Sequence, residues 1–273
     1  MRIESNLKWH ILLILALFIS LMPIVFAVST SFKELSEAYS NVLGIIPDKP
    51  TLSNYLRIFQ ELPLNKITFN TLVVAATVTI FKVITSVMAA YAFVYFDFKG
   101  KNLLYFILIS TIFIPFTMTM IPNYLIISQI GLRNNIMGVI LPQLSDATGI
   151  FLIRQAMRSI PMPLIEAARL EAAGNFQIMA NIVLPLVKPA VISTGIMFFI
   201  NSWNEYVWPV LILKDTTNYT LPLALQLFVS SEGGTDFCLA MAVSVVTMII
   251  PLGLYLIFQK YIINTFTSSG VKG

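Results

Sequence analysis

Five long runs of apolar residues constrain the fold of this chain more than any other feature of its sequence. They cover residues 9–28, 71–95, 103–121, 189–213 and 239–261. An α-helix rises about 1.5 Å per residue, so roughly 20 apolar residues cross the hydrocarbon layer of a bilayer, which is about 30 Å thick. Each run therefore predicts a membrane-spanning helix.

A sixth run, residues 136–152, is interrupted by Pro142, Asp146 and Gly149. We predict a span here as well, because the segment has too few polar residues for a soluble element. Of the 273 residues, 57% are hydrophobic and only 11% are charged, which excludes an ordinary soluble domain. The sequence predicts an all-α membrane protein with a single domain over residues 1–273 and six spans.

Several other classes of protein are excluded or set aside. The net charge of +4 is spread along the chain without a basic block, which argues against nucleic acid as a partner. Cys238 is the only cysteine and His10 the only histidine, so an intrachain disulfide and a multi-Cys or His-pair metal site are excluded. We expect Cys238 to be a small buried residue at the start of the last span. The first run could be a cleaved signal peptide, but it is longer than the usual signal core of about 7 to 15 residues.

The basic residues predict which side of the membrane each connection occupies. With both termini inside, ten bases lie on inner segments, six lie on outer segments, and Lys82 lies within a span. This asymmetry follows the positive-inside rule and predicts cytoplasmic termini. The inner bases are Arg2, Lys8, Lys99, Lys101, Arg154, Arg158, Arg169, Lys188, Lys260 and Lys272, and the outer ones are Lys33, Lys49, Arg57, Lys66, Arg133 and Lys214.

Two outer connections are long enough to have a role of their own. The first, residues 29–67, contains Pro47, Pro50 and Pro63 and fits either a lid over the membrane face or a plain connector. The second, residues 122–132, is amphipathic and is expected to lie along the interface.

The longest cytoplasmic connection, residues 154–188, predicts two short helices separated by a break. Ser159 can cap the first helix, and Pro161 and Pro163 suit its first turn. Gly174 is expected to end it by taking a positive φ, with Asn175 capping a second helix that runs to about residue 183. Pro185 and Pro189 should rigidify the return to the membrane.

The first of these helices has a surface almost without side chains. Ala167, Ala168, Ala172 and Ala173 form this surface, and three charged residues flank it. Such a surface allows a partner to approach closely while Glu166, Arg169 and Glu171 anchor it. We expect this helix to dock in a groove of another protein.

The same residues resemble a known motif. Glu166-Ala167-Ala168, then Glu171-Ala172-Ala173 and later Ile182-x-Leu184-Pro185, are similar to the EAA loop of bacterial ATP-binding cassette (ABC) importer permeases, whose usual form is EAAxxDGA followed by I-x-LP. Glu171 replaces the usual Asp and Ala172 the usual Gly, with Gly174 two residues later.

Further segments extend the resemblance over most of the chain. The run Trp203-Asn204-Glu205-Tyr206-x-Trp208-Pro209 looks like the fifth span of carbohydrate-type permeases, and residues 96–101, 151–155 and 221–223 also match. The chain is similar to the second membrane component of the maltose and sn-glycerol-3-phosphate systems. Residues 145–148 and 233–235 lean toward the glycerol-3-phosphate branch.

This resemblance implies a type I importer permease in the bacterial cytoplasmic (inner) membrane, surrounded by lipid. It implies a heterodimer with a second permease subunit, two ABC ATPase subunits and an extracytoplasmic solute-binding protein for a sugar or sugar-like solute. It also implies that the EAA helix sits in a cleft of the ATPase, whose closure on ATP opens the pore outward. The residues expected to couple are Glu166, Ala167, Ala168, Glu171, Gly174, Leu184 and Pro185.

The chain is not expected to be an enzyme or to hold a cofactor. It has no GxxxxGKS or GxxxxGKT phosphate loop, so ATP and Mg²⁺ should be bound by the partner ATPase. An intramembrane hydrolase would need a GxSG, paired-Asp or HExxH arrangement, and none is present. The alternative class is a six-span secondary transporter that works without ATP, and the EAA loop argues against it.

Polar residues inside the spans are candidates for the solute path. They are costly in lipid and usually face a cavity or a partner. Asn201, Asn204 and Glu205 can bind hydroxyl groups, while Trp203, Tyr206 and Trp208 could stack on a sugar face, or simply anchor at the membrane interface or pack. Lys82 could attract a phosphate or pair with an acid. The candidate path residues are Lys82, Asp146, Asn201, Asn204, Glu205 and Tyr206.

Overall fold

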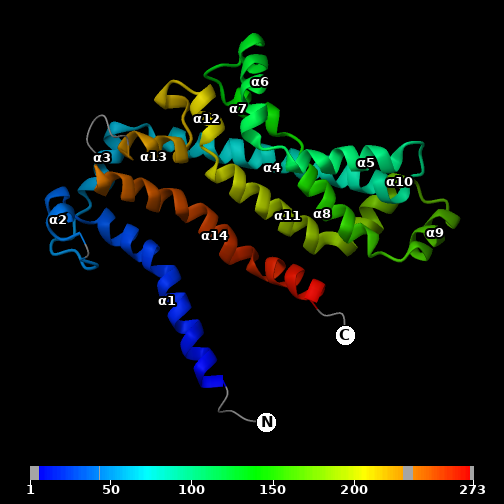
Figure 1. Cartoon of the computed structure of the whole chain (residues 1–273), viewed down its shortest axis with the longest axis horizontal. Coiled ribbons are helices and arrows are strands. Elements are labelled where there is room, and N and C mark those ends of the chain that lie inside the picture. The colour runs from blue at the N-terminus through cyan, green and yellow to red at the C-terminus, as the bar shows by residue number, and fades with distance from the viewer. Residues whose placement is uncertain (1–5, 43, 230–235, 271–273) are drawn as a thin grey trace. The chain divides into compact units, whose positions relative to one another are not determined.

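The computed structural model describes residues 6–42, 44–229 and 236–270, and their side chains over residues 8–42, 44–229 and 236–260. Every regular element in these ranges is a helix (Figure 1). The chain forms two compact units, the first from residues up to Ile67 together with Leu221–Ile250, the second from Thr68–Thr220 and Pro251 onward. Among the sequence predictions, those on Arg2, Lys272 and residues 233–235 lie outside the described residues.

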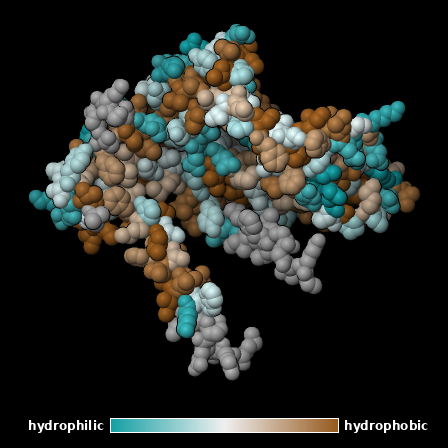
Figure 2. All heavy atoms as spheres, viewed as in Figure 1, coloured by the Kyte–Doolittle hydropathy of each residue, from teal (hydrophilic) through white to brown (hydrophobic). Residues whose placement is uncertain are grey.

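Four long helical runs are long and apolar enough to cross a membrane. They are α1 (Asn6–Ser31), α4 (Leu64–Tyr95), the run from α10 into α11 (Asn175–Asn204), and α14 (Phe237–Gly270). They cover most of the predicted runs 9–28, 71–95, 189–213 and 239–261. Figure 2 shows hydrophobic side chains along α1, where Leu13 and Ile14 are about two-thirds exposed, as a helix surrounded by lipid requires.

The run 103–121 is not the single straight helix that we predicted. It contains α5 (Lys101–Ser110) and a 3₁₀ turn, η2 (Thr111–Phe113), and then bends by 98° into α6 (Phe116–Gln129). Pro115 explains the bend, because proline lacks an N–H and disfavours helical backbone in the residue before it. Ile114 is accordingly extended. Helix α6 also includes most of residues 122–132, the segment predicted to lie along the membrane interface.

The run 136–152 is broken as well. It forms α7 (Ile136–Ile140) and η3 (Leu141–Gln143), then bends by 44° into α8 (Ala147–Arg158), which continues past the predicted end at residue 152. Asp146 starts the second half as its N-cap, with Oδ1 accepting a hydrogen bond from the Thr148 N–H at 2.9 Å. The hydroxyl oxygen of Thr85 lies 3.2 Å from the carbonyl oxygen of Leu144 and 2.8 Å from that of Phe81 in its own helix, so α4 lies close to the break.

The run 189–213 ends as a helix earlier than predicted. Helix α11 (Leu184–Asn204) stops before Glu205, and α12 (Val207–Ile212) follows. Pro209 explains the break, because in a continuous helix its ring would clash with the carbonyl oxygen of Glu205, four residues earlier. The carboxylate of Glu205 then caps α12 by accepting hydrogen bonds from the N–H groups of Val207 (2.8 Å) and Trp208 (3.2 Å).

The halves of run 136–152 lie beside the halves of run 189–213. Helix α12 lies beside α7 and α6 (Figure 1), where the indole N–H of Trp208 donates to the Gly138 carbonyl at 3.2 Å. Helix α8 packs on α11 and α4 through Gly149, where a Cβ atom would lie 2.4 Å from Phe198 Cζ and 2.5 Å from Ser86 Oγ. Only glycine allows these three helices to approach so closely.

In the first unit, α2 (Leu35–Ser40), α3 (Ser53–Glu61) and α13 (Leu221–Val229) join the ends of α1 and α14. Lys33 is buried, and its ammonium donates to the carbonyls of Asn41 (3.3 Å) and Gly44 (2.5 Å). Asn54 donates to the carbonyls of Ser31 and Lys33 at 2.9 and 2.8 Å. These buried side chains and their hydrogen bonds hold the connection 29–67 in a packed structure.

Two further features of this unit concern Arg57 and Cys238. The hydrogen bond from Arg57 to Asp236 at 2.9 Å raises the pKa of the Arg57 guanidinium above its already high value. Cys238 is buried at the start of α14, which confirms that prediction.

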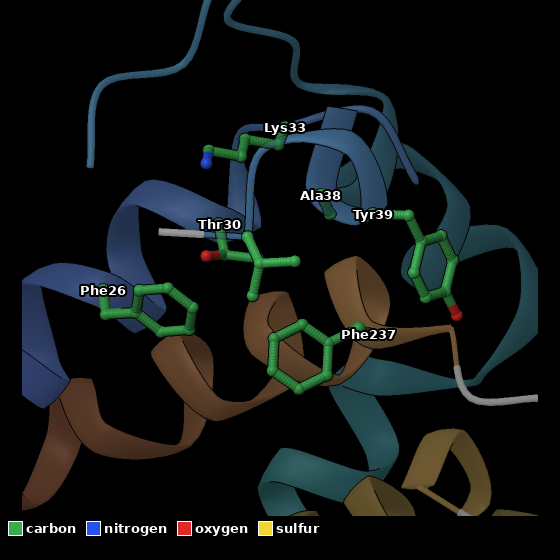
Figure 3. A pocket seen from close by; sticks show the side chains of 7 residues that line it. Phe26, Thr30, Lys33, Ala38, Tyr39 and Phe237 are labelled. Carbon is green, nitrogen blue, oxygen red and sulfur yellow. The ribbon is translucent and has the colours of Figure 1, made fainter. Parts of the chain in front are cut away.

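A small cavity lies in the same unit (Figure 3). Its volume is about 190 Å³, and Phe26, Tyr39 and Phe237 form much of its wall. Ligand pockets usually measure about 300–1,000 Å³ and carry several converging polar groups. This cavity is smaller than that range and its wall is almost entirely apolar, so it is not a candidate sugar site.

Candidate coupling site

The predicted docking helix is α9 (Met162–Leu170), and it begins differently from the prediction. Ser159 does not cap it; this residue ends α8 as its C-cap. The N-cap is Pro161, with extended backbone, and Pro163 occupies the first turn, where a missing N–H costs nothing. Residues 159–161 thus form a short non-helical connection between α8 and α9.

The end of α9 corrects the predicted stop at Gly174. The residue with positive φ is Ala172, at +60°. The Ala173 N–H donates to the carbonyl of Ala168 (3.1 Å), and the Ala172 N–H donates to that of Arg169 (3.0 Å). These two bonds form a Schellman motif, which requires a left-handed residue at position 172. This is where the EAA motif usually has glycine.

Gly174 has an ordinary extended backbone, with φ of −69°. It is the N-cap of α10 (Asn175–Ile178), and its N–H donates to Oε1 of Gln177 at 2.9 Å. Asn175, predicted as the cap, is instead the first helical residue. A Cβ on Gly174 would come no closer than 3.8 Å to Gln177 Oε1, so glycine is not needed there for backbone reasons.

The return to the membrane is a continuous helical run. A π-helical turn, η4 (Met179–Val183), joins α10 to α11 and includes a hydrogen bond from the Leu184 N–H to the Met179 carbonyl. Such a turn accommodates Pro185, which lacks an N–H and would crowd the carbonyl four residues earlier. Leu184 is half-buried and Pro185 exposed at the start of α11.

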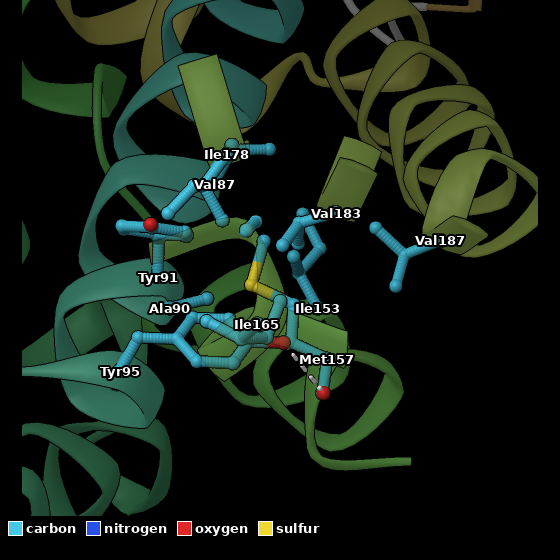
Figure 4. Packing of buried hydrophobic residues seen from close by; sticks show 11 residues of the cluster. Val87, Ala90, Tyr91, Tyr95, Ile153, Met157, Ile165, Ile178, Val183 and Val187 are labelled. Carbon is cyan, nitrogen blue, oxygen red and sulfur yellow. Dashed lines mark hydrogen bonds between the residues drawn. The ribbon is translucent and has the colours of Figure 1, made fainter. Parts of the chain in front are cut away.

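The coupling site is anchored in a hydrophobic core of the second unit (Figure 4). Ile165 and Ala168 of α9 are buried in this core, together with Tyr91 and Tyr95 of α4 and Met157 of α8. Ala168 was predicted to face a partner, but it faces this core because it lies one turn from Ile165 on the same side of the helix. The other members are Val87, Ala90, Ile153, Ile178, Val183 and Val187.

The opposite face of α9 is exposed in the part of the chain that the structure describes. Glu166, Ala167 and Glu171 are exposed, and Leu170 and Phe176 present 89% and 74% of their surface to solvent. A helix with one face in its own core and a charged, small-residue face outside is suited to docking. The sequence did not single out Tyr95, whose carbonyl oxygen accepts a hydrogen bond from Arg169 at 3.0 Å. The only signal for it was a tyrosine at the end of an apolar run.

The structure brings two of the predicted path residues together. Nζ of Lys82 lies 3.1 Å from Oδ2 of Asp146, joining α4 to the N-cap of α8, and 5.1 Å from the centre of the Phe198 ring. Their side chains are 14% and 27% exposed. Of the two roles considered for Lys82, the structure shows the pairing with an acid.

The other four candidates lie around the break between α11 and α12. Asn201 and Asn204 are exposed, although Asn204 donates to the carbonyl of Ile200 at 2.9 Å. Glu205 is occupied as the cap of α12, and Tyr206 is 44% exposed.

Trp203 and Trp208 are buried against other aromatic rings. Trp203 stacks on Phe199, with ring centres 5.6 Å apart, and Trp208 meets Phe116 edge to face at 6.0 Å. Both indoles therefore pack within the chain rather than facing a solute.

Known proteins are similar to this chain along nearly its whole length. The chain is 30% identical over 259 residues to the arabinooligosaccharides transport system permease protein AraQ of Halalkalibacterium halodurans, covering 94% of this chain and 92% of that protein. It is 29% identical over 267 residues to the sn-glycerol-3-phosphate transport system permease protein UgpE of Yersinia enterocolitica, covering 95% of both.

Solved structures show the same fold. A chain of a bacterial ABC transporter involved in the import of the acidic polysaccharide alginate matches with a TM-score of 0.82 at 24% identity, over 96% of this chain and 99% of that one. A chain of the alginate transporter in complex with its alginate pentasaccharide-bound periplasmic protein matches with a TM-score of 0.67 at 15% identity, over 94% and 96%. The likeness confirms the predicted all-α permease fold.

A match to a sequence family covers most of the chain. Residues 62–267, which include α4, the coupling site and all three broken runs, match the family described as "Binding-protein-dependent transport system inner membrane component". The long apolar helices fit a multi-pass protein of the inner membrane. This chain therefore belongs to the family of inner membrane components of binding-protein-dependent transport systems.

Proposed function

We propose that this chain is a permease subunit of an ABC importer for a sugar or sugar-like solute and forms half of the translocation pore. The observation that carries the proposal is α9, which exposes Glu166, Ala167 and Glu171 on one face and is held by its own core on the other. A secondary transporter, which works without ATP, has no use for such a docking helix. The family and the names of the relatives support the same conclusion.

The partners follow from this role. A second permease subunit completes the pore, two ATPase subunits bind ATP and Mg²⁺, and a periplasmic solute-binding protein delivers the solute. Cytoplasmic termini, as the basic residues predict, place α9 on the side of the ATPase. Glu166, Ala167 and Glu171 would contact the ATPase, while Gly174, Leu184 and Pro185 shape the return to the membrane.

Within the sugar-like class, the Lys82–Asp146 pair favours an uncharged solute. Glycerol-3-phosphate, toward which the sequence leans, would need a free cation in the path, and Lys82 is engaged at 3.1 Å by Asp146. The exposed amides of Asn201 and Asn204 and the exposed ring of Tyr206 suit hydroxyl groups and sugar faces. Relatives named for arabinooligosaccharides and for glycerol-3-phosphate mark the two alternatives.

Reconstitution tests the proposal. The complex of this chain with its partner permease, ATPase and binding protein is placed in liposomes, and uptake of labelled arabino-oligosaccharide and of glycerol-3-phosphate is measured with and without ATP at the ATPase side. We expect uptake that requires ATP and the binding protein, with the oligosaccharide preferred. Uptake driven by an ion gradient alone would contradict the importer role. ATP-dependent uptake of glycerol-3-phosphate alone would contradict only the preference.

A further inference from the structure

The C-terminal end of α4 is tied to the coupling helix by a side chain. Tyr95 is the last residue of α4, so its carbonyl oxygen has no partner within the helix. Nη2 of Arg169, in the last turn of α9, donates to this oxygen at 3.0 Å. A guanidinium is well placed there, because the end of a helix carries a partial negative charge.

The side chain of the same tyrosine ties α4 to a third helix. The Tyr95 hydroxyl donates to the carbonyl of Met157, in the last turn of α8, at 3.1 Å (Figure 4). Tyr95 is only 5% exposed, so both bonds are made at the edge of the hydrophobic core. One residue therefore contacts α8 through its hydroxyl and α9 through its carbonyl.

The chain segments on either side of α9 cannot fix its position as firmly as contacts with other helices do. On one side, α8 and α9 are joined by non-helical residues 159–161. On the other side, the chain turns at Ala172 and is extended at Gly174 before α10 begins. A helix held between two such bends can tilt unless contacts with other helices hold it. Those contacts are the burial of Ile165 and Ala168 and the hydrogen bond from Arg169.

We propose that Tyr95 and Arg169 are positioning residues that make α9 and the end of α4 a single rigid body. The inference rests on the proposed function, in which the ATPase displaces α9. A displacement of α9 then carries the end of α4 with it, and α4 also holds Lys82, whose partner Asp146 starts α8. Movement at the docking surface thus reaches the break between α7 and α8 through one helix.

Distance measurement by paired spin labels tests the rigid body without relying on transport. Cys238 is buried and is the only native cysteine, so labels can be placed at Met162→Cys, at the start of α9, and at Asp97→Cys, both on exposed side chains. In the assembled complex, we expect the same narrow distance distribution without nucleotide and with ATP held by a hydrolysis-deficient ATPase. Addition of Arg169→Gln should broaden the distribution in at least one state. A shift of the unsubstituted pair between states would overturn the proposal.

Coupling provides the second readout. Arg169→Gln and Tyr95→Phe should raise the number of ATP molecules hydrolysed per solute transported by roughly two- to thirtyfold, the range of coupling changes seen along such networks. Arg169→Lys should retain part of the coupling. Tyr91→Phe is the matched control, because the Tyr91 hydroxyl is buried in the same core without a hydrogen-bond partner in the described residues. Arg158→Gln, on an exposed residue of the same connection, controls for charge.

The two readouts separate the inference from the function on which it rests. Absence of ATP-dependent uptake by the unsubstituted complex would contradict the proposed function. Normal uptake, with the same coupling ratio in Arg169→Gln, Tyr95→Phe and the two controls, would contradict only the role of the tie.

Discussion

The ammonium of Lys82 lies 3.1 Å from a carboxylate oxygen of Asp146, the residue that starts α8 after the break in the fourth span. The other carboxylate oxygen of Asp146 caps that helix by accepting a hydrogen bond from Thr148. Ion pair and cap therefore stabilise the break together, and the ion pair can be removed while the cap is kept.

Asp146→Asn removes the charge but retains a good N-cap, whereas Lys82→Met removes the cation and keeps the length of the side chain. Each single change leaves one partly buried charge without its partner. We expect each to lower the free energy of unfolding by about 1–3 kcal/mol. The double variant should be less destabilised than the sum of the single variants. This double-mutant cycle is measured by unfolding the variants in detergent with heat or denaturant. Strictly additive losses of stability would show that the pair contributes nothing.

Ala172→Gly should stabilise the coupling site. The φ of +60° at Ala172 costs an L-residue roughly 1–2 kcal/mol, and glycine adopts it readily. We expect a gain of about 1 kcal/mol, seen as slower hydrogen exchange of the amides in α9. Gly174→Ala is the control: its backbone is ordinary, so the same exchange rates should barely change. Faster exchange in Ala172→Gly would contradict the Schellman end.

Gly149→Ala should be poorly tolerated. The new methyl group would lie 2.4 Å from Phe198 Cζ and 2.5 Å from Ser86 Oγ, so α4, α8 and α11 would have to move apart. Overpacking of this kind costs about 1–3 kcal/mol, and we expect a matching fall in thermal stability. Phe198→Leu in the same chain should recover part of the loss. At Gly195 the nearest atom would lie at 3.5 Å, so Gly195→Ala should be neutral or stabilising. Equal effects at both glycines would contradict the close approach.

The sequence predicted the helices that depend on composition and missed the features that depend on geometry. Apolar runs indicate spans because each span must satisfy its backbone internally and bury its side chains in lipid. The breaks in these runs were missed, although Pro115, Asp146 and Pro209 mark them, because a hydropathy run does not distinguish a continuous helix from two short ones. Pro142 and Asp146 did weaken the prediction for residues 136–152, and that run proved to be broken.

The coupling site shows the same limit. The EAA pattern predicted a short docking helix, and α9 is that helix. The pattern did not indicate which alanines face inward, and Ala168 is buried at 8% exposure because Ile165 sets the inward side. Nor could it reveal the bond between Tyr95 and Arg169, which lie 74 residues apart in the chain.

Charge reversal at Glu166 tests the coupling role most directly. Glu166→Lys changes an exposed residue of α9, so this chain should fold normally. Asp97→Lys is the matched control, because the side chain of Asp97 is fully exposed outside α9 and its ion pair with Lys101 contributes little. A bulky residue at Gly174 should also impair uptake, through contact with the ATPase rather than through backbone strain.

The decisive measurement is ATP-dependent uptake of solute by liposomes containing the whole complex, made with the unsubstituted chain, Glu166→Lys and Asp97→Lys. We predict that uptake is lost in Glu166→Lys, while this chain remains folded and inserted in the membrane, and is unchanged in Asp97→Lys. Uptake by Glu166→Lys at the unsubstituted rate would contradict coupling through α9.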